Sequence, residues 1–148
     1  MKIYIGSDHA GYELKEKLKI FIEAQKLEVV DKGAFSMNPI DDYPDFIIPV
    51  AEEVGKDHES RGIVLGGSGE GEQIAANKID GVRALEYYGG NLNVVKLARQ
   101  HNDANILSLG ARFINEEEAK DAVLIFLNTP FSGDERHIRR INKIEESN

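Results

Sequence analysis

Cysteine is absent from the chain. Its absence excludes disulfide bonds, thiolate metal sites and a cysteine nucleophile, and it makes the reducing cytoplasm the simplest expected location. Long apolar runs are absent too, because charged residues interrupt every apolar stretch well before it reaches membrane-spanning length. The first residues, 1–6, lack the pattern of a secretory signal peptide. We therefore expect a cytoplasmic protein with no membrane partner.

Positive charge is scarce, since 18 lysines and arginines face 26 acidic residues and leave a formal net charge of −8. This balance opposes nonspecific attraction to nucleic acid and to anionic membranes, and we expect no nucleic-acid partner. An anionic small substrate would need a local basic patch. The 148 residues, 41% of them hydrophobic, are enough for one core. We expect a single domain over residues 1–148.

Strand-like and helix-like segments alternate along the chain. Apolar runs predict strands at residues 3–6, 27–30, 62–65, 82–85 and 106–109. Helical periodicity predicts helices at residues 11–25, 44–56, 72–78, 92–101 and 116–128, with a basic helix within 133–147. Short strands that are apolar throughout are typical of a parallel sheet covered on both faces. We therefore expect a doubly wound, Rossmann-like or flavodoxin-like α/β fold: a five-stranded parallel sheet, helices on both faces and a C-terminal basic helix.

A glycine-rich run at residues 66–73 follows the third predicted strand and opens onto a helix. Such a turn presents free backbone N–H groups, and its glycines let the backbone approach a ligand closely. The run lacks the Lys-Ser or Lys-Thr of a P-loop and the spacing of the dinucleotide motif. Its carboxylates suit a reaction in which a base removes a proton and N–H donors hold the resulting oxyanion. The alternative is a tight strand-to-helix turn with solvated acids.

Other candidate residues lie in turns at the expected carboxyl edge of the sheet or near helix ends. Asp8 and His9 follow the first strand, where Asp8 either caps a helix or joins His9 in proton transfer or anion binding. His101 ends a predicted helix, where a cation is also favoured by the helix dipole, and an alternative role for Asn102 is to end that helix.

Arginines near the end of the chain could supply the basic patch. Arg136 and Arg140 are four residues apart and share one helical face, which suits a phosphate as well as it suits salt bridges; Arg112 is open to the same two interpretations. The four histidines are scattered, and none belongs to a compact metal-ligand motif, so we expect no metal unless distant residues cluster in space.

Six short motifs occur in a distinctive order at residues 6–15, 41–44, 62–78, 101–105, 110–112 and 136–140. Taken together, they resemble ribose-5-phosphate isomerase type B and its sugar-phosphate isomerase relatives, which include galactose-6-phosphate isomerase subunits. The resemblance runs nearly end to end. Many members have a catalytic cysteine where this chain has Gly66. This sequence resembles much more closely a second subgroup that reads Gly-Gly-Ser-Gly-x-Gly-Glu-Gln and takes its base from the Glu of that run, here Glu72.

The resemblance implies interconversion of ribose 5-phosphate and ribulose 5-phosphate through an enediolate, without a cofactor. It implies that Asp8 and His101 assist opening of the sugar ring and that Glu72 moves the proton between C1 and C2. A raised pKa would suit Glu72 to this task, and partial burial beside Glu70 would raise it. The same resemblance implies that the enediolate is stabilised by the hydroxyl of Ser68 and by the N–H groups of residues 67–71, which include Gly67, Gly69 and Gly71.

The resemblance also implies how substrate is held. His9 and Arg112 would bind the phosphate, joined by Arg136 and Arg140 of a partner subunit, because the family builds its site across a dimer interface. Tyr43 and Asn102 would line the sugar. We therefore expect a homodimer, with a tetramer as the alternative assembly.

Three other functions remain open from the sequence. A six-carbon substrate, such as galactose 6-phosphate or allose 6-phosphate, would use the same phosphate and enediol chemistry. A noncatalytic flavodoxin-like binding or regulatory domain needs no base, and it predicts that Glu72 points into solvent. A nucleotide-dependent enzyme would need a pyrophosphate cradle.

Overall fold

A parallel five-stranded sheet lies at the centre of the computed structural model, which describes residues 1–147. The strands are β1 (Lys2–Ser7), β2 (Glu28–Asp31), β3 (Arg61–Gly66), β4 (Ala84–Tyr87) and β5 (Ile106–Gly110). They pair in the order β2-β1-β3-β5-β4 with every neighbouring pair parallel. The predicted α/β fold with a parallel sheet is confirmed.

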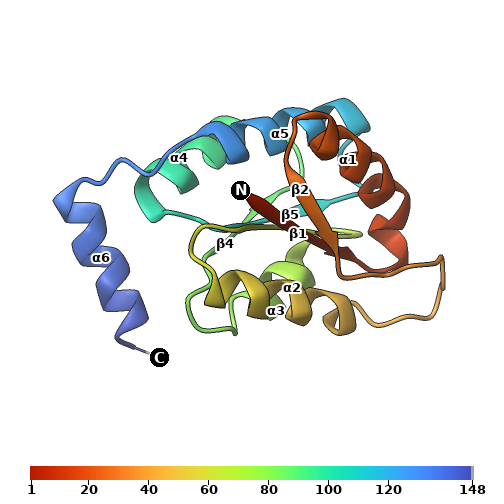
Figure 1. Ribbon diagram of the computed structural model, residues 1–148, viewed down its shortest axis with the longest axis horizontal. Helices are drawn as coiled ribbons and strands as arrows, with labels where there is room; N and C mark the ends of the chain where they lie inside the picture. The colour runs from red at the N-terminus through yellow and green to blue at the C-terminus, as the bar shows by residue number, and fades with distance from the viewer. Residues whose placement is uncertain (148) are drawn as a thin grey trace.

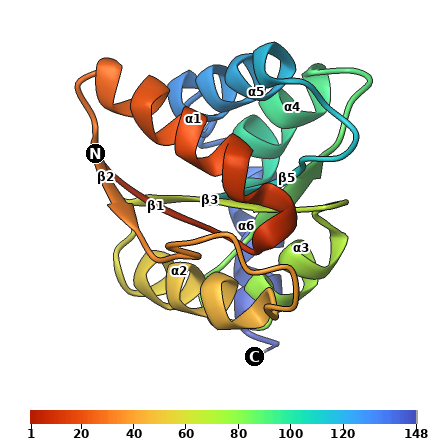
Figure 2. The ribbon, with the colours of Figure 1, turned by 90° about the vertical axis from the view of Figure 1, so that its right-hand side faces the viewer.

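Helices cover both faces of the sheet. They are α1 (Tyr12–Ala24), α2 (Pro44–Lys56), α3 (Glu70–Ala76), α4 (Asn93–Asn102), α5 (Glu116–Asn128) and α6 (Glu135–Glu145), with a short 3-10 helix η1 (His9–Gly11). In Figure 2, α1, α4 and α5 lie above the sheet, and α2 and α3 lie below it. The basic helix α6 lies beyond one end of these layers (Figure 1). No helix within residues 1–147 combines the length and the apolar character that a membrane crossing requires.

The core forms on both faces because strand side chains alternate in direction. Ile3, Ile5, Ile63 and Leu65 are fully buried and pack toward the layer of α1, α4 and α5. Val64, between the last two, is also fully buried but packs toward the layer of α2 and α3. A strand buried on both faces reads as a continuous apolar run, which is why the central strands could be predicted from the sequence.

The sheet changes winding direction between β1 and β3. From β1 the chain crosses to β2 on one side, and from β2 it returns to β3 on the other side. In open parallel sheets, ligands bind at the carboxyl ends of the strands beside such a point. The turn after β1 and the glycine-rich turn after β3 both lie there, so the fold brings the two segments together.

Element boundaries differ from the prediction in one informative place. The predicted strand at 82–85 is β4 at Ala84–Tyr87, which therefore includes Glu86. Arg83 precedes the strand and is held by Asn105, whose side-chain oxygen accepts from the Arg83 N–H at 2.7 Å. The predicted strand ended at residue 85 because the next residue, Glu86, is charged and ends the apolar run. In the structure Glu86 nevertheless belongs to the strand and pairs with Ser108 of β5.

Candidate active site

Asp8 directly follows β1 and caps η1. Its Oδ1 accepts hydrogen bonds from the N–H groups of Ala10 (3.0 Å) and Gly11 (3.4 Å), and the residue is 7% exposed. The capping role considered from the sequence is therefore present. Both bonds use Oδ1, so capping leaves Oδ2 for a substrate.

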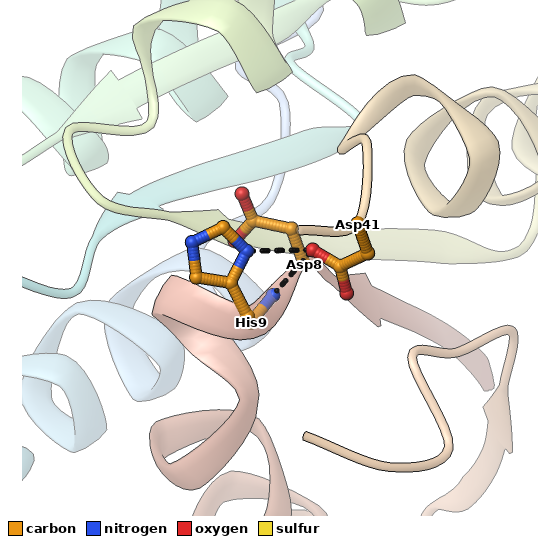
Figure 3. A group of neighbouring side chains, drawn as sticks. All are labelled: Asp8, His9 and Asp41. Carbon is orange, nitrogen blue, oxygen red and sulfur yellow. Dashed lines mark hydrogen bonds and ion pairs between the residues drawn. The ribbon is translucent and has the colours of Figure 1, made fainter. Parts of the chain in front are cut away.

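His9 is oriented by Asp41, a residue from the segment before α2 (Figure 3). Asp41 Oδ1 accepts from the His9 backbone N–H at 3.1 Å and lies 2.6 Å from His9 Nδ1. With the hydrogen on Nδ1, the ring donates to Asp41 and turns Nε2 away from that carboxylate. No role for Asp41 was predicted, because 32 residues separate it from His9 and no local pattern links them.

Asp8, His9 and Asp41 also place one ligand atom each within 4.8 Å of one another. This is the spatial clustering that histidine spacing alone could not reveal. However, Asp8 Oδ1 caps η1, and His9 Nδ1 is bonded to Asp41. Because Asp41 Oδ1 lies 2.6 Å from His9 Nδ1, we interpret the group as an arrangement that orients the His9 ring.

The glycine-rich turn joins β3 to α3 at the same edge. Gly69 precedes α3 with a φ of 84°, in the left-handed region that favours glycine. The carbonyls of Gly66 and Gly67 accept from the N–H groups of Ala111 (2.8 Å) and Arg112 (3.0 Å), which follow β5. Ser68 Oγ accepts from the Glu70 N–H at 3.2 Å. The bonds from Ala111 and Arg112 hold the turn against the loop after β5, and the bond to Ser68 lies within the turn.

Glu72 lies under this turn and is only 4% exposed. Its carboxylate occupies the space beside Gly66 in which a Cβ would stand, so any larger residue at position 66 would overlap with it. Burial raises the pKa of Glu72, and the negative charge of Asp8 adds to the effect. We expected Glu70 to be the charged neighbour; Asp8 takes that place. The binding-domain alternative predicted a solvated Glu72, which the structure contradicts.

Two further predicted residues reach the turn from other segments. A Cβ added at Gly71 would stand 2.7 Å from Cζ of Tyr43, so the phenol ring lies against that glycine. A Cβ added at Gly67 would stand 3.0 Å from a terminal guanidinium nitrogen of Arg112. One edge of the sheet therefore gathers three carboxyl groups, a histidine, a phenol, a hydroxyl and an arginine: Glu72, Asp8, Asp41, His9, Tyr43, Ser68 and Arg112.

His101 and Asn102 lie at the opposite edge. They end α4, which runs back along the sheet, and the Asn102 carbonyl accepts from Arg83 Nε at 3.1 Å, just before β4 begins. The five residues of β5 separate the two edges, and at roughly 3.3 Å per residue this is about 15 Å. Within one chain, His101 therefore does not meet Asp8 or Glu72.

Helix α6 accompanies His101 at this second edge, to the left in Figure 1, whereas the turn after β1 lies to the right. The rings of His101 and His137 stack, with centroids 4.4 Å apart and an angle of 18° between their planes. Arg136 and Arg140 flank His137 on α6, and both are exposed. The predicted site residues thus form two groups at opposite ends of the strands.

Comparison with known proteins identifies the family to which this chain belongs. The family described as Ribose/Galactose Isomerase matches residues 3–144. Ribose-5-phosphate isomerase B of Mycolicibacterium paratuberculosis is 44% identical over 146 residues, which cover 99% of this chain and 91% of that protein. The chain belongs to the ribose/galactose isomerase family, and the resemblance inferred from its motifs is confirmed.

Solved structures agree in fold. Ribose-5-phosphate isomerase B from Mycoplasma genitalium, with ribulose-5-phosphate bound, has a TM-score of 0.94 and 39% identity, covering 99% of this chain and 95% of that one. The ribose 5-phosphate isomerase from Thermotoga maritima has a TM-score of 0.90 and 45% identity, with coverage of 98% and 97%. The match therefore extends over nearly the whole length of both chains.

Proposed function

We propose that this protein is an aldose-ketose isomerase that interconverts ribose 5-phosphate and ribulose 5-phosphate through an enediolate. The observation that carries the proposal is the burial of Glu72 beside Gly66, under a turn of glycine N–H groups and next to Asp8. Relatives named ribose-5-phosphate isomerase B, one of them solved with ribulose-5-phosphate bound, support the choice of substrate.

Glu72 is the proposed base. It removes the hydrogen on C2 of the open-chain aldose and returns a proton to C1, while the hydroxyl proton passes from O2 to O1. A general base works best when its pKa approaches the working pH, and burial moves the pKa of Glu72 in that direction. The enediolate oxygen is held by the N–H groups of Gly67, Gly69 and Gly71 and by the hydroxyl of Ser68.

The phosphate binds at the carboxyl edge of the sheet. His9 presents Nε2 because Asp41 holds Nδ1, and Arg112 lies over Gly67. A phosphate carries about two negative charges near neutral pH, so further cations would stabilise it. Arg136 and Arg140 are the proposed further ligands, although in their own chain they lie at the other edge.

A second subunit resolves this separation. In the proposed homodimer, His101, Asn102, Arg136 and Arg140 of the partner subunit face Asp8 and Glu72 across the interface. His101 and Asp8 then open the furanose ring, and Asn102 and Tyr43 line the sugar. Exposed apolar side chains support an interface on this part of the molecule; they include Leu97 on α4 and Ile138 on α6, which are 38% and 41% exposed.

The test is a direct assay of initial rates with ribose 5-phosphate, allose 6-phosphate and galactose 6-phosphate. We expect ribose 5-phosphate to be converted with the highest kcat/KM. Preference for a six-carbon sugar phosphate would keep the chemistry and change the substrate, and conversion of none of the three would refute the proposal.

Glu72→Gln tests the base in the same assay. The fold and substrate binding should persist, and turnover should fall by roughly 10²- to 10⁴-fold, the usual contribution of a general base. Glu70→Gln is the matched control, because Glu70 neighbours the turn but is exposed. Near-normal turnover of Glu72→Gln would remove this residue from its role.

A further inference from the structure

A third acidic side chain, Glu86, reaches the glycine-rich turn from β4. Alternation along the strand directs it toward the face covered by α3, on the same side as Ser108 of β5. A Cβ added at Gly69 would stand 2.6 Å from each carboxyl oxygen of Glu86, so the group lies directly against the turn. Both oxygens are buried, and within residues 1–147 neither has a hydrogen-bond partner.

The charges that face Glu86 favour its neutral form. Glu70 and Glu72 of α3 contribute negative charge, whereas the hydroxyl of Ser108 on β5 acts in the opposite direction and lowers the pKa of Glu86. Burial raises the pKa of Glu86 to about 8, and the charges of Glu70 and Glu72 act in the same direction. An ionised carboxylate that is buried without a donor is costly, whereas a neutral acid avoids most of that cost.

Ser108 offers a hydrogen-bond acceptor to a neutral acid at position 86. Its hydroxyl donates to the Gly69 carbonyl at 2.7 Å, and a hydroxyl has only one hydrogen to give. Its oxygen can still accept. A protonated Glu86 can therefore donate to the Ser108 hydroxyl, which is itself bonded to the Gly69 carbonyl. Gly69 directly precedes α3, so these two bonds would fix where α3 begins and hence where Glu72 lies.

We propose that Glu86 is a positioning residue that holds the glycine-rich turn as a neutral acid and releases it on ionisation. In the neutral form it completes the chain from Glu86 through Ser108 to Gly69. In the ionised form the donor is lost, and a second negative charge lies beneath the turn that must hold an anionic intermediate. The catalytic consequence rests on the proposed isomerase function, whereas the protonation of Glu86 does not.

The direction of the pH dependence of kcat/KM follows from the neutral and ionised forms of Glu86. Activity depends on protonated Glu86, so kcat/KM should fall as the pH rises through about 8. Glu86→Gln keeps the shape of the neutral acid, can donate from its amide, and cannot ionise, so this alkaline decline should disappear. Glu86→Leu also cannot ionise but donates nothing. It should lower kcat more than Glu86→Gln does and should likewise lack the decline near pH 8.

The experiment combines carbon-13 NMR of the glutamate carboxyl groups with initial rates from ribulose 5-phosphate between pH 6 and about 9.5. The Glu86 carboxyl carbon, assigned through its backbone resonances in the wild-type protein, should titrate near pH 8. That signal should vanish in Glu86→Gln and persist in Glu70→Gln, the matched control. The NMR measurement needs no activity, so it remains decisive if the protein acts on another substrate.

Two results would overturn the proposal. One is a Glu86 carboxyl that titrates near the ordinary value of 4.5. The other is an alkaline decline in kcat/KM that is the same in Glu86→Gln as in the wild type, which would mean that another group causes it.

Discussion

At the scale of single residues, one glycine determines where the proposed base can lie. Gly66 ends β3, and the Glu72 carboxylate fills the space that a Cβ there would need. In the cysteine-bearing members of the family, as the resemblance implies, a side chain at this position would occupy the same space. Glycine at 66 and a buried glutamate at 72 are therefore two parts of one arrangement.

Gly66→Ala should remove activity through Glu72. Gly66 does not adopt a positive φ, so alanine fits the backbone, and the nearest overlap that must be relieved is the one with the carboxylate. We expect turnover to fall by roughly 10²-fold or more as the base is displaced. Because both changes act on one group, the Gly66→Ala/Glu72→Gln double variant should be no worse than Glu72→Gln alone. Losses that multiply in the double variant would contradict the coupling.

Asp8 should set part of the acid limb of the pH profile. Glu72 must be ionised to act, so activity falls as the pH drops through its pKa, which burial and then Asp8 hold above 4.5. Asp8→Asn keeps a good helix cap and removes the charge, so the limb should move to lower pH. Initial rates from ribulose 5-phosphate, which needs no ring opening, measure this effect, with exposed Asp42→Asn as the control. An unmoved limb would exclude Asp8 as the cause.

The residues of the glycine-rich turn could be predicted from the sequence, but the residues that contact and position the site from other segments could not. The motif named Ser68 and Glu72 because they are adjacent to the glycines. Asp41 and Glu86 went unassigned, because each meets its neighbour only through the fold, from segments well separated along the chain. Such pairs become visible only once the order of the strands is known.

At the scale of elements, the direction of α4 decides the geometry of the site. Five strands and six helices were predicted: the strands read as apolar runs, most clearly the central ones that are buried on both faces, and the helices as amphipathic segments. The same strand and helix pattern implies that α4 runs back along the sheet and ends at its amino edge. His101 is consequently far from Asp8 within one chain. The sequence motifs did not reveal this distance, because a motif does not show at which end of the strands its residues lie.

His101→Ala tests the role of this helix end. If His101 opens the ring, turnover at saturating ribose 5-phosphate should fall by roughly 10²-fold or more, the usual contribution of an acid-base group. Turnover at saturating ribulose 5-phosphate, which cannot form a furanose, should fall much less. Gln100→Ala is the control on the same helix. Equal losses of turnover with the two substrates would remove ring opening from the role of His101.

At the scale of the whole molecule, an acidic chain with a net charge of −8 carries three of its seven arginines on a helix outside the layered body. Helix α6 is attached at the amino edge of the sheet, where Glu145 pairs with Arg83 at 2.7 Å. Asp8 and the proposed base Glu72 lie at the other edge. A closed two-fold dimer would bring each edge of one subunit to the complementary edge of the other, and it would form two equivalent sites.

The most direct test of this split site mixes two inactive proteins. Glu72→Gln subunits lack the base, and Arg136→Ala/Arg140→Ala subunits lack the arginines. In a mixed dimer whose arginines act across the interface, one of the two sites is intact, so statistical mixing should restore about one quarter of the wild-type activity per subunit. If subunit exchange is confirmed by mass and no activity returns, the arginines do not complete the partner's site, and the account is contradicted.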